Sequence, residues 1–136
     1  MAAVDMSKLH VLVVEDQIYV RNIIKEALTV RNTGKISAVA NGYEALATLQ
    51  NAERKVDVIL LDLVMPRLNG YDFIKKLRNE LPPSLSGTPV IVISGLRDKE
   101  ALDKVKKLGI DLFLLKPITA DHLVTRISAA MRRQLE

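Results

Sequence analysis

The chain of 136 residues has no cysteine and no tryptophan, and its aromatic residues are three tyrosines and two phenylalanines. Without cysteine, disulfides, thiolate metal sites and cysteine nucleophiles are excluded. With so few aromatic residues and no recognition motif, direct binding to nucleic acid is not expected. No apolar run approaches the roughly 20 residues of a membrane span, and the first run is too short for a signal peptide. We therefore expect a cytoplasmic protein that does not insert into membranes.

What the chain does contain is the balance of one soluble globular domain, with 49% hydrophobic and 26% charged residues. We expect a flexible N-terminal tail over residues 1–8 and a single domain over residues 9–136. The net charge of +4 is mild. The excess of Lys and Arg is greater in residues 97–136 than before them, which we interpret first as solvated helix faces and second as a docking face for a protein partner.

Four short apolar runs each break off at a charged or hydroxyl side chain. They are 11–14 before Glu15 and Asp16, 58–61 before Asp62, 90–93 before Ser94, and 112–115 before Lys116. Runs of Val, Ile and Leu between turn signals are typical of strands buried on both faces. Each polar residue alone is also explained as a helix cap, a turn residue or a solvated charge. Because parallel strands end at one edge of a sheet, their joint placement favours a site there.

Amphipathic helices alternate with these strands. We expect strands at 11–14, 36–39, 56–61, 90–93 and 111–115, and helices at 18–31, around 45–49, from about Tyr71, at 99–108 and at 120–135. Pro82 and Pro83 end the third helix, and a loop through Gly87 follows. Strict alternation favours a parallel sheet, and right-handed crossovers leave few topologies. The expected fold class is α/β, flavodoxin-like and doubly wound: a five-stranded parallel sheet in the order 2-1-3-4-5 with helices on both faces.

The three carboxylates at this edge indicate a metal site. Glu15, Asp16 and Asp62 carry like charges, whose close approach is costly unless a cation offsets them. Oxygen ligands without His or Cys favour a hard ion, and a small set with room for water suits Mg²⁺. Lys116 and Ser94 add a fixed positive charge and a hydroxyl, which suit a phosphoryl group. One carboxylate could accept that group as an acyl phosphate, and Asp62, at the end of the middle strand, is the best candidate.

The chain resembles the receiver domain of two-component response regulators from about Leu9 to Arg133, and in particular the single-domain type of the chemotaxis regulators. The segments that carry the resemblance are Val-Val-Glu-Asp at 13–16, Ala-Asn-Gly-Tyr-Glu-Ala-Leu at 40–46, Leu-Leu-Asp-Leu-Val-Met-Pro-Arg-Leu-Asn-Gly at 60–70, Val-Ile-Val-Ile-Ser at 90–94 and Leu-Leu-Lys-Pro at 114–117. Each segment is a weak signal by itself. In this order and spacing they are highly specific.

The resemblance implies a mechanism of phosphorelay signalling. Asp62 would accept a phosphoryl group from a phosphohistidine on a sensor histidine kinase or a histidine phosphotransfer protein. Mg²⁺ would be held directly by Asp16 and Asp62, through water by Glu15, and by the backbone carbonyl of Val64. Lys116 would pair with the phosphoryl oxygens.

The resemblance also implies a switch. Ser94 would move to hydrogen-bond the phosphoryl group, and Phe113 would swing inward behind it. This pair would reshape the face formed by the helix at 99–108, the strand at 111–115 and the helix at 120–135, which would bind a downstream protein target.

Three positions depart from the pattern of many members. Phe113 stands where Tyr is common, so a hydroxyl-dependent contact of the switched state is lost. Val64 and Leu96 are the positions that flank the phosphoryl group, and both are apolar here. Neither side chain can orient an attacking water by hydrogen bonding. We therefore predict a longer-lived phosphoryl group than in members with Asn, Glu or Lys at these positions.

Other readings remain open at this level. The chain could be a chemotaxis-type shuttle, a phosphorelay intermediate or the receiver part of a longer regulator with an output domain. An aspartyl-phosphate hydrolase is an alternative from the enzyme class. Such enzymes require a second acidic residue two positions after the nucleophile, and here that position is Val64. A flavodoxin-like nucleotide binder would need a Gly/Ser/Thr phosphate loop after the first strand. Glu15 and Asp16 stand there instead, and two carboxylates would repel a phosphate without a metal.

Overall fold

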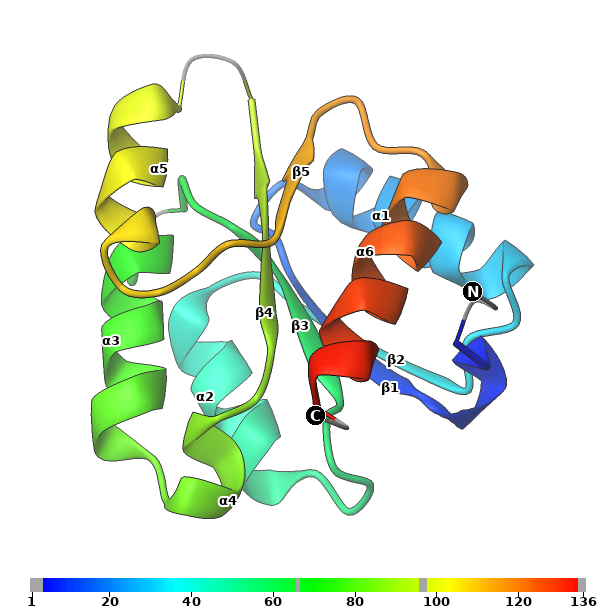
Figure 1. The fold of residues 1–136 in the computed structure, drawn as a ribbon, viewed down its shortest axis with the longest axis horizontal. Helices are drawn as coiled ribbons and strands as arrows, with labels where there is room; N and C mark the ends of the chain where they lie inside the picture. The colour runs from blue at the N-terminus through cyan, green and yellow to red at the C-terminus, as the bar shows by residue number, and fades with distance from the viewer. Residues whose placement is uncertain (1–3, 66, 96–97, 135–136) are drawn as a thin grey trace.

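The computed structural model describes residues 4–65, 67–95 and 98–134, and its core is a five-stranded parallel sheet (Figure 1). The strands are β1 His10–Val14, β2 Lys35–Val39, β3 Val58–Asp62, β4 Val90–Ser94 and β5 Phe113–Leu115. Their spatial order is β2-β1-β3-β4-β5. The expected order 2-1-3-4-5 and the flavodoxin-like architecture are thus confirmed.

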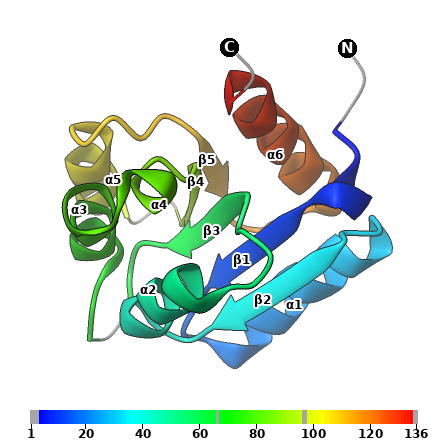
Figure 2. The same ribbon diagram turned by 90° about the horizontal axis from the view of Figure 1, so that it is seen from below.

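Five longer helices cover the two faces of the sheet. They are α1 Ile18–Val30, α2 Gly42–Asn51, α3 Gly70–Glu80, α5 Lys99–Lys106 and α6 Ala120–Gln134. Helices α1 and α6 lie on one face, and α2, α3 and α5 on the other, so the sheet is enclosed between two helical layers (Figure 2). No helix within the described ranges is both long and apolar enough to cross a membrane.

The apolar runs become strands because both of their faces are buried. Val11 and Val13 belong to the core beneath α1 and α6, whereas Leu12 and Val14 belong to the core beneath α2, α3 and α5. Side chains alternate between the faces of a strand, so an unbroken apolar run fills two cores at once. The edge strand β2 has only half-buried or exposed residues, which explains its weaker apolar pattern.

The register aligns the carboxyl ends of the strands. Val14 at the end of β1 is paired with Val39 and Leu61, Asp62 with Ile93, and Ser94 with Leu115. The residues that follow the four apolar runs therefore share one edge of the sheet. This is the arrangement in which open α/β folds place their sites.

The segment between α3 and β4 differs from the expected loop. Pro83–Ser86 forms a single helical turn, α4, in which Pro83 occupies the first turn, where a missing N–H costs least. The guanidinium of Arg78 donates to the carbonyls of Ser86 and Thr88 at 2.6 and 2.8 Å and holds this turn against α3. Strand β5 is also shorter than expected, because only residues 113–115 pair with β4.

The N-terminal segment is a second correction. The sequence predicts a flexible tail over residues 1–8. Residues 1–3 lie outside the described residues, but Met6–Lys8 forms a short 3₁₀ helix, η1, with Met6 buried against the core under α1 and α6. The amide of Val4 donates to Ser128 Oγ at 3.1 Å, and the amide of Gly34 donates to the Met6 carbonyl at 2.9 Å. The packed domain therefore includes residues 4–8, because Met6 buries apolar surface.

Candidate functional site

Three carboxylates meet at the carboxyl edge of the sheet. Glu15 and Asp16 follow β1, and Asp62 is the last residue of β3. Each offers an oxygen, and these oxygens all lie within 4.8 Å of one another. Glu15 is only 1% exposed and Asp62 4%, whereas Asp16 is half-buried. The neighbouring strand ends have thus brought together residues that are distant in the sequence.

Glu15 is strongly affected by its buried position in this cluster. Burial is the largest influence and raises the pKa of its carboxyl from 4.5 to about 8, and the proximity of Asp62 acts in the same direction. Lys116 and the amide of Gln17 lower the pKa but do not offset burial. Its Oε2 has no hydrogen-bond partner among the described residues. A buried oxygen without a donor is costly, so this position favours a bound cation or water.

The cluster fits a hard divalent cation on the chemistry of its donors. All three side chains supply oxygen, no sulfur or imidazole competes, and the orphaned Glu15 Oε2 provides unused acceptor capacity. Mg²⁺ prefers such carboxylate sets and retains several waters. The group formed by Glu15, Asp16 and Asp62 has the composition of such a site.

Arg21 anchors the backbone beneath the cluster. Its Nη1 donates to the carbonyl of Glu15 at 2.8 Å, and the amide of Glu15 donates to the carbonyl of Val39 on β2 at 3.1 Å. The backbone of Glu15 is therefore held from both sides. We did not predict this role, although Arg21 lies in the first turns of α1 directly after the acidic pair, which is the available sequence signal.

Lys116 supplies the positive charge of the site. Its Nζ lies 3.9 Å from Asp62 Oδ1, and its amide donates to the carbonyl of Ser94 at 2.8 Å. The Lys116–Pro117 peptide bond is cis. A lysine ammonium that faces a nearly buried carboxylate oxygen is well placed to neutralise charge that collects on that oxygen.

Ser94 and Phe113 occupy neighbouring strands. Ser94 is 2% exposed at the end of β4, where it pairs with Leu115, and Phe113 lies two residues earlier on β5. The Phe113 ring is half-buried beneath the Lys106 ammonium, 5.5 Å from Nζ to the ring centroid. Its carbonyl accepts a hydrogen bond from Arg126 Nε at 2.9 Å. Phe113 therefore contacts basic residues of both α5 and α6.

The loop after β3 is fixed by a close approach of two backbones. The Gly70 amide donates to the Leu63 carbonyl at 3.0 Å, and a Cβ on Gly70 would lie 2.8 Å from Leu63 Cα. Only glycine fits there. Val64 is 60% exposed, and its amide donates to Asp62 Oδ1 at 3.3 Å. Leu96, the other position expected to flank the phosphoryl group, lies outside the described residues.

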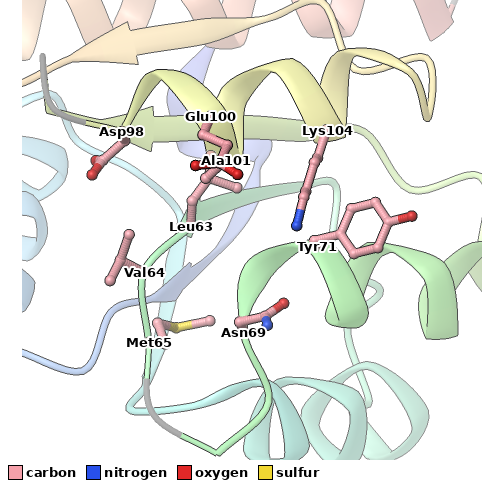
Figure 3. Close-up of a pocket in the computed structure, with 9 residues that line it drawn as sticks. All are labelled: Leu63, Val64, Met65, Asn69, Tyr71, Asp98, Glu100, Ala101 and Lys104. Atoms are coloured by element: carbon pink, nitrogen blue, oxygen red, sulfur yellow. The ribbon is translucent and has the colours of Figure 1, made fainter.

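A cavity of about 490 Å³ opens beside this loop (Figure 3). It is lined by Leu63, Val64, Met65, Asn69, Tyr71, Asp98, Glu100, Ala101 and Lys104.

Asp98 is a residue of this site that the sequence does not predict, because an acidic residue before a helix indicates an ordinary N-cap. In the structure its Oδ2 accepts a hydrogen bond from the Gly95 amide at 2.7 Å, directly after Ser94.

Comparison with known proteins agrees with this geometry. The family model of the response regulator receiver domain matches residues 11–128. Probable transcriptional regulator ycf27 of Cyanidium caldarium is 35% identical over 126 residues, which cover 91% of this chain and 47% of that protein. Regulatory protein VirG of Agrobacterium fabrum is 35% identical over 125 residues, 90% of this chain and 46% of that protein. The chain thus spans about half the length of these curated relatives.

Solved structures give the same answer for the fold. The chemotaxis protein CheY4 of Vibrio cholerae superposes with a TM-score of 0.78 at 28% identity, covering 90% of this chain and 98% of that chain. The receiver domain of the Francisella response regulator 1452 superposes with a TM-score of 0.74 at 30% identity, covering 93% and 98%. With its sheet order, its edge of acidic residues and these matches, the chain belongs to the response regulator receiver domain family of two-component signalling.

Proposed function

We propose that Asp62 is the phosphoacceptor of this receiver domain and that it takes the phosphoryl group from a phosphohistidine with the help of Mg²⁺. The observation that carries this proposal is the position of Asp62. It ends the central strand of the sheet, it is nearly buried, and it faces the Lys116 ammonium at 3.9 Å as well as two further carboxylates.

The metal would be held by Asp16 and Asp62 directly, by Glu15 through water, and by the backbone carbonyl of Val64. When bound, Mg²⁺ supplies positive charge against the oxygens of the transferring phosphoryl group. The residues of this chain supply the rest. Lys116 offsets the negative charge of the phosphoryl oxygens, and Arg21 holds the backbone of Glu15 through its carbonyl.

The transfer itself is a displacement at phosphorus. A carboxylate oxygen of Asp62 forms the new P–O bond while the P–N bond of the phosphohistidine breaks, and the electron pair of that bond returns to the imidazole nitrogen of the donor. The product is an acyl phosphate on Asp62. No proton has to leave Asp62, because its carboxylate attacks in the ionised form.

The donor would be a sensor histidine kinase or a histidine phosphotransfer protein in the cytoplasm.

The donor would dock on an outward stripe of α1. This stripe carries Tyr19, Ile23 and Val30, which are 82%, 55% and 63% exposed. Positions four and seven residues apart share a helix face, and exposed apolar side chains gathered on one face favour an interaction site. Because the stripe begins three residues after Asp16, a protein seated on it would have its phosphohistidine near the acidic cluster.

The output would come from Ser94 and Phe113. Ser94 would shift toward the phosphoryl oxygens, and the Phe113 ring would move inward. Such a movement takes the ring away from Lys106 and alters the surface of α5, β5 and α6, where a downstream protein would bind. We propose this signalling role rather than an enzyme with an external substrate. The apolar Val64, two residues after Asp62, leaves a hydrolase without its second acid.

The test is incubation with Mg²⁺ and acetyl phosphate, followed by intact-mass measurement. We expect one added phosphoryl group on the wild type and none on Asp62→Ala or in the presence of a chelator. Asp72→Ala is a matched control, because Asp72 is an exposed carboxylate on α3 outside the site. An unmodified wild type, or equal modification of Asp62→Ala, would overturn the proposal.

A further inference from the structure

Asp98 stands at the N-cap position of α5 but does not cap this helix. Within the described part of the chain its carboxylate makes no cap bond to α5. Instead, Oδ2 accepts the Gly95 amide at 2.7 Å, and the Asp98 amide donates to the Gly95 carbonyl at 3.2 Å. An aspartate at an N-cap ordinarily accepts from the second or third amide of its own helix. Asp98 has therefore exchanged the usual partner for the Gly95 amide.

The Gly95 amide belongs to the edge where Asp62 lies. Gly95 directly follows Ser94, and the strand that Ser94 ends is paired with β3 through Asp62 and Ile93. The Asp98 carboxylate lines the same cavity as Leu63 and Val64, the two residues that follow Asp62 (Figure 3). Backbone amides at such strand ends are ready anion-binding groups. This one already holds an anionic oxygen.

We propose that Asp98 is an internal competitor for the phosphoryl group. In the unphosphorylated domain the Asp98 carboxylate accepts the hydrogen bond of the Gly95 amide. A phosphoryl group on Asp62 displaces the carboxylate and accepts this hydrogen bond in its place. Asp98 is thus a positioning residue that acts through Gly95 and regulates the same site. The inference rests on the proposed role of Asp62 as phosphoacceptor.

The displaced Asp98 carboxylate has alternative hydrogen-bond donors at the N-terminus of α5. The N-terminus of α5 offers unpaired amide groups at its first turn, as every helix does, and Asp98 is at the position from which an aspartate reaches them. Release from Gly95 would therefore let Asp98 cap α5. Occupation of the site would in this way be coupled to the helix that borders the proposed output surface.

Charge adds to the competition. A carboxylate at the Gly95 amide places a negative charge in the cavity beside the loop that follows Asp62. An incoming phosphoryl group carries negative charge and meets this repulsion until Asp98 has moved. Removing the charge alone, as in Asp98→Asn, should have a smaller effect than removing both the charge and the acceptor, as in Asp98→Ala.

The experiment measures the dissociation constant of beryllofluoride, which takes the place of a phosphoryl group on a carboxylate, by calorimetry in excess Mg²⁺. We expect binding about threefold to tenfold tighter for Asp98→Ala, because the variant loses a hydrogen bond to a charged group that opposes binding, less the smaller contribution of the α5 cap that it also loses. We expect a smaller gain for Asp98→Asn. Mg²⁺ affinity without beryllofluoride should be unchanged in both, because Asp98 is not among the clustered carboxylates.

Glu100→Gln is the matched control. Glu100 lines the same cavity and loses one negative charge in this variant, but it makes no hydrogen bond to Gly95 among the described contacts. The amide proton resonance of Gly95 gives a second readout. In the free protein it should move upfield in Asp98→Ala, and beryllofluoride should return it downfield in both proteins.

Equal or weaker beryllofluoride binding by Asp98→Ala would overturn the inference, as would a gain of the same size in Glu100→Gln. An unchanged Gly95 resonance would also contradict it, even if the affinities differ. A wild type that binds no beryllofluoride would refute the phosphoacceptor role of Asp62 itself. The proposed competition by Asp98 would then be refuted as well.

Discussion

The ammonium of Lys116 lies 3.9 Å from Asp62 Oδ1, although Asp62 ends β3 and Lys116 follows β5, two strands that are not adjacent in the sheet. Strand β4 lies between β3 and β5, so the lysine side chain spans the carboxyl edge of the sheet to approach Asp62. Asp62 is nearly buried and Lys116 is about one-third exposed, with a side-chain exposure of 31%. A partly exposed pair of this kind contributes little to stability. Its value lies in the positive charge that it places beside a carboxylate oxygen of Asp62, the proposed phosphoacceptor.

We predict that Lys116→Ala reduces phosphorylation by acetyl phosphate about a hundredfold, since a preorganised charge at the reacting oxygens has an effect of that order. The unfolding free energy should change by about 1 kcal/mol or less, because the pair is partly exposed. Rates followed by intact mass and urea unfolding measure the two effects. Lys104→Ala, which removes a cavity lysine outside the acidic cluster, is the control. A comparable loss of rate in that variant would contradict the prediction.

Glu15→Gln should stabilise the metal-free domain by about 1–2 kcal/mol at pH 8 while weakening Mg²⁺ binding, because an amide is less costly than a carboxylate in a buried position without a donor. Urea unfolding without metal and Mg²⁺ titration measure the two changes. A variant that is less stable than the wild type under metal-free conditions would refute the reasoning.

The same residue predicts a pH dependence. Burial holds the pKa of Glu15 at about 8 in the folded state against 4.5 in the unfolded chain, so the folded state binds more protons between these values. Stability of the metal-free wild type should therefore fall as pH rises from 4.5 to 8. Glu15→Gln should lack this contribution. The comparison is made by unfolding both proteins in a chelator across this pH range, and parallel profiles would count against the assignment.

Val64→Asn should shorten the lifetime of the phosphoryl group about tenfold, because an amide beside Asp62 can orient an attacking water by hydrogen bonding. Val64 is exposed at the mouth of the site and makes no such contact through its apolar side chain. Decay of phosphorylated protein after removal of the donor is the measurement. Val64→Ala removes apolar cover without adding a hydrogen-bonding group and should decay at nearly the wild-type rate. Unchanged or slower decay in Val64→Asn would sink the idea.

Gly70→Ala should destabilise the domain by about 1–3 kcal/mol and lower its rate of phosphorylation, because the new Cβ would meet the Leu63 backbone and push the loop after Asp62 out of place. Gly87→Ala is a matched control. Nothing lies within 4 Å of a Cβ at that position, and its φ of −91° suits alanine. Thermal unfolding and acetyl phosphate kinetics of both variants test the difference. Equal effects would show that the close approach is unimportant.

Ile23→Glu should slow transfer from a phosphohistidine protein at least about tenfold, because a charge in the centre of an apolar contact must be desolvated. Phosphorylation by acetyl phosphate should remain at the wild-type rate, since this small donor needs no docking surface. Asn22→Glu, also on the exposed part of α1, places the same charge beside the stripe. A loss of both reactions in Ile23→Glu would point to misfolding rather than docking.

Much of the fold was predictable because its signals are local. The runs at 11–14, 58–61 and 90–93 predict strands buried on both faces, and their parallel alignment places Glu15, Asp16 and Asp62 at one edge without further information. The packing of Met6 was not predictable, since a single apolar residue in a short polar segment has no periodicity. The turn at α4 depends on Arg78, whose contacts to Ser86 and Thr88 are not visible in any pattern.

The amino-acid sequence alone sets the order of strands and helices, the edge at which the polar residues gather, and the kinds of side chain at that edge. It could do so because hydrophobic periodicity and chain connectivity are properties of neighbouring residues. Three features emerge only from the packing of distant segments. Glu15 is buried with an oxygen that has no partner among the described residues, Arg21 holds its backbone, and Asp98 bonds to the Gly95 amide rather than to its own helix. The desolvation and the choice of partner that set these roles depend on atoms from several separate segments. The sequence pattern of an aspartate next to a strand is the same whether its carboxylate accepts a phosphoryl group, caps a helix or competes for a backbone amide.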